Sequence, residues 1–290
     1  MNKKVYKIPY LNFYTRAYTF GDINSGVPLI ILHGGPGGCV ERYEPLEKLA
    51  DLGIPLIFYD QLGCGYSKVP KNHGISWNFA VFINELKNLI NFFKLKKFNI
   101  LGHSWGGMLA LEYVTNFEHK GLDKLVLFST LPSTKMWNDE HLKMIERFSE
   151  DEKSALLSEK DGKAFDKNIY KKAIKKFYKE HVGKRSTTYY DFKRKKFPKT
   201  NKEIYELMWG KSELFGTGAL KNWSVEEKLN LVDVPTLIIS GFFDESSPYI
   251  NEFMHKNIRN SRQILLKKSH HIGYAEETSL VIKTLSNFLK

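Results

Sequence analysis

This sequence of 290 residues has only two cysteines and no apolar run that approaches the length of a membrane span. Two cysteines are too few for a disulfide framework, so we expect a cytoplasmic protein in which Cys39 and Cys64 pack as small buried side chains. The first residues are positively charged, but no apolar stretch follows them, and we therefore expect no signal peptide. No Cys/His cluster has the spacing of a zinc site, so we expect neither a metal nor a cofactor.

Acidic residues are scarce, since 32 Asp+Glu stand against 44 Lys+Arg and leave a net charge of +12. The excess is local: residues 163–202 hold 15 Lys+Arg and three acids, while the rest of the chain balances. A basic patch of this kind can attract nucleic acid or acidic substrates. Lysine outnumbers arginine there and no nucleic-acid motif accompanies it, so we favour a solvated helical face and expect no nucleic-acid partner.

Short apolar runs recur along the chain, and most of them are followed by a helical pattern. The predicted strands span residues 5–10, 13–20, 28–32, 55–59, 98–101, 124–128, 235–239 and 263–266. The predicted helices include residues 43–52, 76–94 with Ser76 as N-cap, and 276–289. Continuous apolar strands that alternate with helices predict a mostly parallel sheet covered on both faces.

The strand pattern stops between about residue 132 and residue 223, where the chain is charged, helical and rich in aromatic residues. We interpret this segment as a helical cap inserted between two parts of one core. The predicted organisation is residues 1–131 for the first part of the core, 132–224 for the cap and 225–290 for the second part.

The motif Gly-x-Ser-x-Gly occupies residues 102–106, between an apolar run and a helix-like run. A sharp turn from strand to helix lifts a serine hydroxyl above the sheet, and small neighbours are needed where the two backbones meet. The motif therefore predicts a nucleophile elbow with Ser104 as the nucleophile. Glycine and serine are common residues, so the motif alone is weak evidence, and the prediction depends on residues found later in the chain.

A serine nucleophile needs a base, and the base needs an orienting acid. In α/β hydrolases the chain order is serine, acid and histidine, with the last two placed after later strands. Asp244 follows the predicted strand at 235–239, and both His270 and His271 follow the strand at 263–266. We favour His271, because the pattern His-x-x-x-x-Glu-Glu that enters the last helix begins at that residue.

Acyl transfer also needs hydrogen-bond donors for the developing oxyanion. The backbone amide of Trp105, directly after the nucleophile, is one candidate, and Gly35 in the glycine-rich loop at residues 33–38 is the other. The loop lacks the Lys-Ser/Thr ending of a phosphate loop. We expect His33 to brace this loop and His103 to be structural.

Three segments together resemble the prolyl aminopeptidases, also called proline iminopeptidases, and the related tricorn-interacting aminopeptidase. They are His33 to Gly37, Tyr59 to Gly65 and Gly102 to Gly107, and residues 208–210, 212–213, 217–218 and 221–223 of the predicted cap match as well. The similarity spans nearly the whole chain. It implies the α/β-hydrolase fold, a mostly parallel sheet flanked by helices with an inserted helical cap.

The resemblance implies a serine aminopeptidase that releases the N-terminal residue of short peptides, with Glu213 and Glu245 holding the free α-amino group. Paired carboxylates near the nucleophile suit this task, since an exopeptidase must measure one residue from a charged terminus. Lys211, Leu214 and Phe215 depart from the pattern of proline-preferring members, so the released residue is expected to be proline or another apolar residue. Four apolar side chains either line its pocket or form the core of the cap: Met208, Trp209, Phe215 and Trp223.

The same triad would also serve an esterase, a lactonase or an amino-acid amidase, and a non-catalytic ligand sensor is a more distant alternative. For the leading hypothesis the expected partners are short peptides with a free N-terminus, with neither nucleic acid nor a membrane involved. Ser104 attacks the first peptide carbonyl after His271, oriented by Asp244, has taken its proton.

Overall fold

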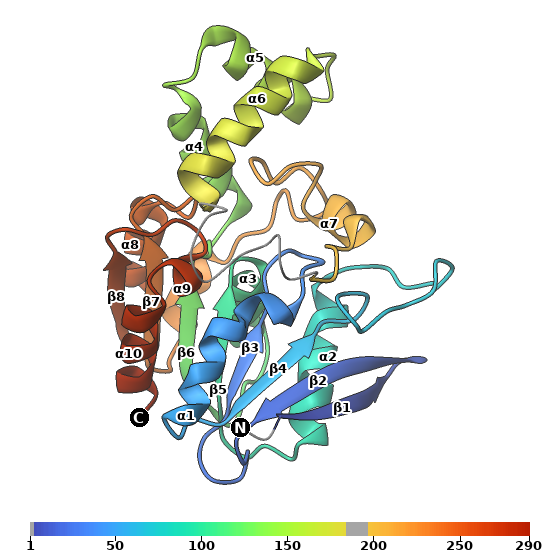
Figure 1. The fold of residues 1–290 in the computed structure, drawn as a ribbon, viewed down its shortest axis with the longest axis vertical. Helices are drawn as coiled ribbons and strands as arrows, with labels where there is room; N and C mark the ends of the chain where they lie inside the picture. Colours follow the sequence, from blue (N-terminus) through green and yellow to red (C-terminus); the bar gives the residue numbers. More distant parts are fainter. Residues whose placement is uncertain (1–2, 184–196) are drawn as a thin grey trace.

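The structure, a computed structural model, describes residues 3–183 and 197–290, so part of the basic stretch at 163–202 lies outside the described residues. Its centre is an eight-stranded sheet in the order β1-β2-β4-β3-β5-β6-β7-β8 (Figure 1). The strands are β1 (Lys3–Tyr10), β2 (Phe13–Phe20), β3 (Leu29–Leu32), β4 (Leu56–Asp60), β5 (Phe98–His103), β6 (Leu122–Phe128), β7 (Thr236–Gly241) and β8 (Ser261–Leu266). Neighbours from β4 to β8 pair in parallel, whereas β2 pairs antiparallel with β1 and β4, which confirms a mostly parallel sheet.

Helices connect most of the parallel strands. They are α1 (Lys48–Asp51), α2 (Phe79–Phe92), α3 (Trp105–Asn116), α4 (Thr134–Ile145), α5 (Glu150–Lys160), α6 (Lys167–Phe177), α7 (Lys202–Met208), α8 (Pro248–Asn257), α9 (Gly273–Glu276) and α10 (Thr278–Leu289). Short 3₁₀ helices form η1 (Val40–Glu47) and η3 (Glu226–Leu231), and η2 (Tyr178–Val182) is one π-helical turn. Within the described ranges, no helix combines the length and the apolar character needed to cross a membrane.

Both faces of the sheet are covered, which explains why its inner strands are apolar throughout. Ile30 and Leu32 belong to the cluster on the side of α2, α3 and α8, whereas Leu29 and Ile31 belong to the cluster on the side of η1, α1 and α10 (Figure 1). Successive side chains of a strand point to opposite faces, so a strand between two helical layers buries every residue.

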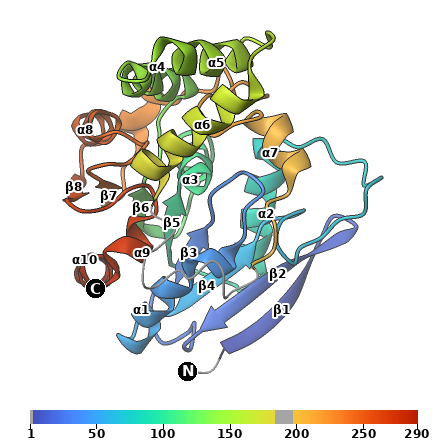
Figure 2. The same cartoon turned by 45° about the horizontal axis from the view of Figure 1, so that its top comes forward.

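The segment between β6 and β7 contains α4 to α7 and lies over one end of the sheet (Figure 2). The described residues of this segment contain no strand, and one antiparallel bridge between Ser133 and Ser224 joins its two ends. Part of it has an apolar core of its own, formed by Ile145, Phe148, Leu156, Ala173, Phe177, Leu214 and Phe215. The segment is therefore a helical layer packed on the core.

Two helix boundaries differ from the sequence prediction. Helix α2 begins at Phe79 rather than near Ser76, because the side chain of Asn78 accepts a hydrogen bond from the Val81 amide and caps the helix. The last predicted helix, residues 276–289, begins at Thr278 as α10, because Glu276 ends the short helix α9 and Glu277 between them has a non-helical φ of −121° and ψ of 46°. The predicted helix at 43–52 consists of the end of η1 followed by α1.

Candidate active site

Ser104 occupies the turn between β5 and α3, the position that the sequence motif predicts. Its backbone has a φ of 55° and a ψ of −123°, which is a strained conformation for a residue with a side chain. A Cβ atom on Gly106 would collide with the carbonyl oxygen of Leu32, and one on Gly102 would collide with the carbonyl of Gly106. The close approach of strand and helix therefore requires both glycines.

The glycine-rich loop after β3 packs directly against this turn. A Cβ atom on Gly34 would lie 3.1 Å from Cβ of Ser104, and the Gly34 amide donates to the hydroxyl of Tyr43 at 2.7 Å. In the described part of the chain, the amides of Gly35 and Trp105 donate to no other protein group. Two unpaired donors on the two loops that meet at Ser104 are what an oxyanion hole needs.

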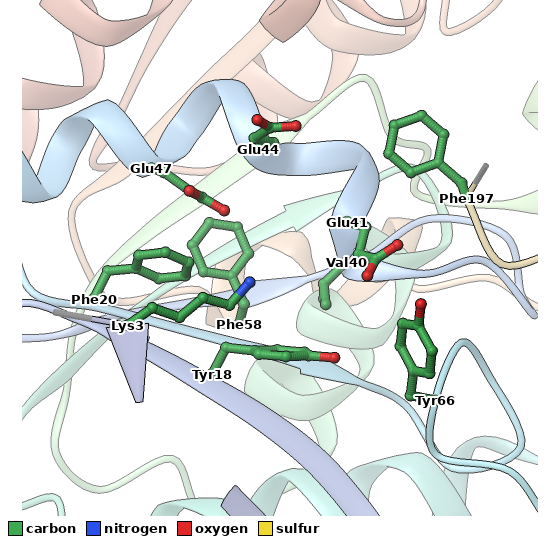
Figure 3. A pocket seen from close by; sticks show the side chains of 10 residues that line it. All are labelled: Lys3, Tyr18, Phe20, Val40, Glu41, Glu44, Glu47, Phe58, Tyr66 and Phe197. Carbon is green, nitrogen blue, oxygen red and sulfur yellow. The ribbon is translucent and has the colours of Figure 1, made fainter. Parts of the chain in front are cut away.

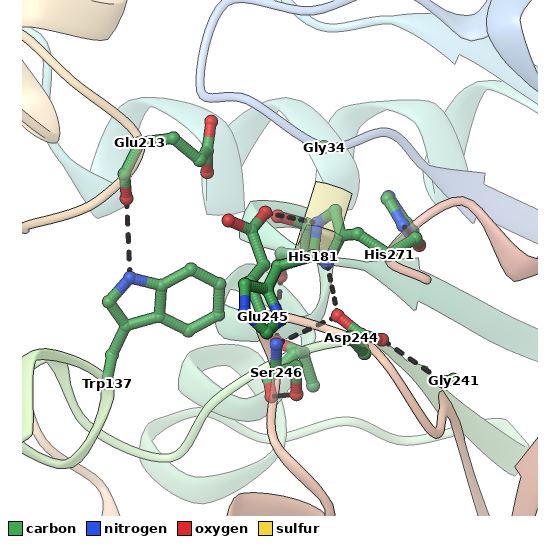
Figure 4. A network of polar contacts seen from close by, with 12 residues as sticks. Gly34, Trp137, His181, Glu213, Gly241, Asp244, Glu245, Ser246 and His271 are labelled. Atoms are coloured by element: carbon green, nitrogen blue, oxygen red, sulfur yellow. Dashed lines mark hydrogen bonds and ion pairs between the residues drawn. The ribbon is translucent and has the colours of Figure 1, made fainter. Parts of the chain in front are cut away.

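Asp244 and His271 meet above the ends of β7 and β8. Nδ1 of His271 lies 2.8 Å from Oδ1 of Asp244, whose carboxylate also accepts hydrogen bonds from the amides of Ser246 and Gly241 (Figure 4). Burial alone would raise the pKa of Asp244, but His271 and these hydrogen bonds outweigh it, so the pKa is lowered and the group is a carboxylate. The carboxylate fixes the proton on Nδ1 and leaves Nε2 of His271 as the basic atom.

The same carboxylate decides the protonation behaviour of His271. Burial is the largest single effect and lowers the pKa of this imidazole, but the charge and hydrogen bond of Asp244, together with the charges of Glu213 and Glu276, outweigh it, and the net result is a raised pKa.

His270, the other candidate, has a different partner. Its ring Nδ1 lies 3.0 Å from Oε1 of Glu276, and its amide donates to the same carboxylate at 2.6 Å. Glu277 accepts hydrogen bonds from the Lys268 amide and the Ser269 hydroxyl. The two acids of the predicted His-x-x-x-x-Glu-Glu pattern therefore hold the loop that carries His271.

Glu245 is a fully buried carboxylate without a hydrogen bond to either oxygen among the described residues. Its Oε1 lies 3.5 Å from Nε2 of His271 (Figure 4). Burial is the main reason why the pKa of Glu245 is raised well above the ordinary value, and the neighbouring charges of Glu213 and Asp244 raise it further. An unpaired buried carboxyl group beside the basic atom of His271 is a strong candidate for a ligand contact.

Glu213 belongs to the helical layer between β6 and β7, whereas Asp244 and Glu245 follow β7. Oε2 of Glu213 accepts a hydrogen bond from the hydroxyl of Tyr205 at 2.7 Å, and its carbonyl accepts from the indoles of Trp209 and Trp137. Burial raises the pKa of Glu213, whereas the charge of His271 lowers it. The structure thus brings the two predicted carboxylates into one electrostatic cluster with the Asp244–His271 pair.

Several residues that support the site carried no assigned role in the sequence analysis. Gln61, within the segment 59–65 used for the resemblance, accepts from the indole nitrogen of Trp105 at 2.8 Å and donates to the carbonyl of His33 at 3.1 Å. It therefore ties the glycine-rich loop to the elbow. Tyr205 had no signal in the sequence, because its role depends on the position of Glu213 in space.

The two histidines that were expected to be structural have buried rings with fixed partners. Nε2 of His33 accepts from the Gln61 amide at 3.0 Å, so the predicted bracing of the loop is confirmed. His103 contacts the hydroxyl of Tyr43 at 2.8 Å and the carbonyl of His271 at 3.0 Å. Burial lowers the pKa of His33 to about 4 and that of His103 to about 3, so both rings are neutral at pH 7.

The apolar side chains expected to line a pocket or fill the cap are mostly interior. Phe215 packs in the separate core of the helical layer, and Met208 and Trp209 belong to the main core cluster. Trp223 is partly buried beside Phe79, at a ring distance of 5.5 Å. Cys39 is buried and free.

No group of three or more His, Cys, Asp or Glu side chains within residues 3–183 and 197–290 is arranged to hold a metal ion. The second cysteine, Cys64, is also buried and free, which confirms the packing role predicted for both thiols. A hollow of about 380 Å³ lies elsewhere, beside β1, β2 and η1, where the ammonium of Lys3 lies 4.6 Å from the ring centre of Tyr18 (Figure 3). None of the residues that line it belongs to the site around Ser104.

Comparisons with known proteins agree with this architecture. The family model described as the alpha/beta hydrolase fold matches residues 27–278. A proline iminopeptidase of Lactobacillus acidophilus is 33% identical, over 98% of this chain and 97% of its own length. The crystal structure of VinJ has a TM-score of 0.87 at 28% identity and covers 99% of this chain and 98% of its own. The crystal structure of a proline iminopeptidase of Mycobacterium smegmatis has a TM-score of 0.85 at 25% identity, covering 99% of this chain and 97% of its own. With the fold, the elbow and these relatives in agreement, this chain belongs to the proline iminopeptidase family of the α/β hydrolases.

Proposed function

We propose that this protein is a serine aminopeptidase that releases the N-terminal residue, proline or another apolar residue, from short peptides. The observation that carries the proposal is the buried carboxyl group of Glu245, which accepts no hydrogen bond among the described residues, lies 3.5 Å from Nε2 of His271 and has its pKa raised further by the charge of Glu213. An esterase or lactonase of the same fold has no need of such a carboxylate pair beside its base. The relatives named proline iminopeptidases support the same conclusion.

The chemical step follows from the way the imidazole is held. Because Asp244 occupies Nδ1 of His271, Nε2 is free to take the proton from the hydroxyl of Ser104 as the oxygen attacks the first peptide carbonyl. The amides of Gly35 and Trp105 stabilise the negative charge that develops on the carbonyl oxygen. His271 then protonates the leaving amine, and a water molecule activated by the same Nε2 hydrolyses the acyl-enzyme.

The carboxylate pair supplies the specificity for a free N-terminus. Before a substrate binds, the raised pKa of Glu245 favours its neutral form, which lowers the cost of burying two acids side by side. A substrate ammonium stabilises the charged form and forms charge-assisted hydrogen bonds with Glu245 and Glu213, each worth about 1.5–3 kcal/mol. An N-acetylated peptide has no such charge and leaves both acids without a cationic partner.

The proposal includes the helical layer over the site. Residues 132–224 act as a cap that admits only short peptides, with residues 1–131 and 225–290 as the core that carries the triad. The Ser133–Ser224 bridge at the two ends of this segment supports these boundaries. Two buried free thiols favour a cytoplasmic location.

The test is a panel of aminoacyl p-nitroanilides (Pro, Ala, Leu and Phe), each with its N-acetylated counterpart and a matched simple ester. We expect kcat/KM to fall by at least about tenfold on acetylation, which corresponds to the loss of one charge-assisted hydrogen bond. Ser104→Ala should abolish turnover, and Ser154→Ala, on the exposed side of α5, serves as the matched control.

The panel also separates the proposal from its rivals. Equal turnover of the N-acetylated and the free anilides would show that Glu213 and Glu245 do not bind the free amino group. A strong preference for simple esters over every anilide would favour an esterase or lactonase with the same triad.

A further inference from the structure

Two histidines of the cap contact the backbone on either side of Asp244. Nδ1 of His181, in η2, lies 3.0 Å from the carbonyl oxygen of Phe243. Nε2 of His141, in α4, lies 3.0 Å from the carbonyl oxygen of Glu245, and its Nδ1 lies 2.6 Å from the carbonyl oxygen of Leu214, so the neutral ring can donate to only one of the two. The acid loop, defined here as residues 243–245, therefore contacts the cap through its first and last carbonyls.

The hydrogen bonds of His181 define its tautomer. Nη2 of Arg147 lies 2.8 Å from Nε2 of His181, and a guanidinium can only donate, so Nε2 is the acceptor and Nδ1 carries the proton. The Nδ1–H group then donates to the carbonyl of Phe243. Arg147 is itself held by the carboxylate of Glu180 at 2.7 Å. Burial lowers the pKa of His181, which maintains the neutral ring that this arrangement requires.

His181 also contacts the second catalytic loop. Its carbonyl oxygen accepts a hydrogen bond from the backbone amide of His271 at 3.1 Å. One cap residue thus binds the loop of the acid through its ring and the loop of the base through its backbone.

Packing alone does not account for this arrangement. The ring of His181 lies 4.9 Å from the ring of Phe177, and a phenylalanine could make that contact equally well. A phenylalanine could not make the two hydrogen bonds of this ring. Arg147 donates to Nε2 of His181, and the Nδ1–H group of His181 donates to the carbonyl of Phe243, directly before Asp244. Such supporting hydrogen bonds fix the orientation of a catalytic group that they do not touch.

We propose that His181 is a positioning residue that holds Asp244 against His271, so that the cap aligns the triad in addition to covering it. Arg147 orients the His181 ring. The inference rests on the proposed triad of Ser104, Asp244 and His271.

The experiment measures kcat, KM and the pH dependence of kcat/KM for the proline anilide in variants of the full chain. His181→Phe keeps the ring but removes the donor, and we expect kcat to fall by about tenfold or more with KM little changed, as expected for a misplaced catalytic group. His181→Asn restores most of kcat, because its side-chain amide can donate from nearly the position of Nδ1. Arg147→Met, at an exposed position, also lowers kcat, but by less than His181→Phe. The matched control is Lys135→Met on α4, which removes another cation of the cap that forms an ion pair, and we expect it to behave as wild type.

The pH profile separates positioning from a merely structural role. A loosened acid loop weakens the contact of Asp244 with His271, so the acid limb of kcat/KM moves to lower pH in His181→Phe, although Glu213, Glu245 and Glu276 still face the imidazole. A folded His181→Phe protein with the wild-type kcat and acid limb would overturn the inference, as would a His181→Asn protein as impaired as His181→Phe. If His181→Phe does not fold, the Arg147→Met and Lys135→Met pair decides by the same two readouts.

Asp244→Asn is measured alongside as the reference for the proposed function. Wild-type turnover by that variant would refute the triad itself, whereas an inactive Asp244→Asn beside an unaffected His181→Phe would refute only the positioning role.

Discussion

Glu85 is a buried acid outside the proposed catalytic set, and it gives the sharpest quantitative prediction. It lies on α2, where Oε2 accepts a hydrogen bond from the Leu62 amide at 2.9 Å and Oε1 contacts the hydroxyl of Thr15. Burial raises its pKa from 4.5 to about 8, and the hydrogen bonds from Thr15 and Leu62 offset only part of this effect. At neutral pH the folded protein therefore carries a protonated Glu85.

The sign of the effect follows from counting protons. Between pH 4.5 and about 8, the unfolded chain has lost the Glu85 proton while the folded chain retains it. The folded state thus binds more protons than the unfolded state, and the free energy of unfolding falls as the pH rises through this window. The cost is about 1.4 kcal/mol per pH unit inside the window, which gives about 3.5 kcal/mol between pH 5 and pH 8.

Glu85→Gln should remove this cost, because the amide has the shape of the protonated acid and does not titrate. Gln can accept from the Leu62 amide with its oxygen and donate to Thr15 with its nitrogen. We expect the variant to be close to wild type at pH 5 and more stable than wild type by about 3.5 kcal/mol at pH 8, with a constant difference above that pH.

The assay is urea unfolding of both proteins at pH 5, 6, 7, 8 and 9, with Glu206→Gln at an exposed position of α7 as the control for loss of one acid. Comparing two proteins at each pH cancels the titration of every other group that they share. A stability difference that stays constant from pH 5 to pH 9 would refute the reasoning, since it would mean that Glu85 does not change protonation on folding.

Three further predictions concern the site. Ser104→Ala should lose both turnover and labelling by a fluorophosphonate while it unfolds at the wild-type temperature; residual labelling would point to another nucleophile. Because Asp244 raises the pKa of His271, kcat/KM should decline on acidification with a midpoint above 6.5, and a midpoint below that value would contradict the assigned contact. Binding of prolinamide to Ser104→Ala near neutral pH should release a proton from Glu245, seen by calorimetry in buffers of different ionisation enthalpy; Glu245→Gln should show no such release.

The sheet and the elbow could be predicted from the sequence because their signals are local. The apolar run at 28–32 and the Gly-x-Ser-x-Gly motif each follow from contacts that a short segment makes with its immediate surroundings. Gly106 is constrained instead by the fold, since the backbone that would collide with a larger side chain belongs to Leu32 of the neighbouring strand β3. In this fold a neighbouring parallel strand always lies beside the turn, so the position of Gly106 requires a glycine whatever the rest of the sequence is.

Helix ends were less predictable, because equally good local signals compete. Ser76 and Asn78 are both favourable N-cap residues, and nothing within the segment ranks one above the other. At the end of the chain, the predicted helix begins two residues late, at Thr278, and the Glu277 carboxylate just before it accepts hydrogen bonds from Lys268 and Ser269, in the loop before His271. In this second case a tertiary contact overrides the local preference.

The contacts between cap and core leave the least trace in the sequence. His141 and His181 bind backbone carbonyls, and every residue has a carbonyl, so Phe243 and Glu245 need no particular side chain to serve as partners. A pattern of residue types therefore cannot reveal such a pair, whereas it can reveal Asp244 and a histidine after successive strands. The role proposed for His181 therefore becomes visible only when the helical layer is placed on the sheet. If that role is correct, substitutions in this layer change kcat although the proposed triad of Ser104, Asp244 and His271 is unchanged.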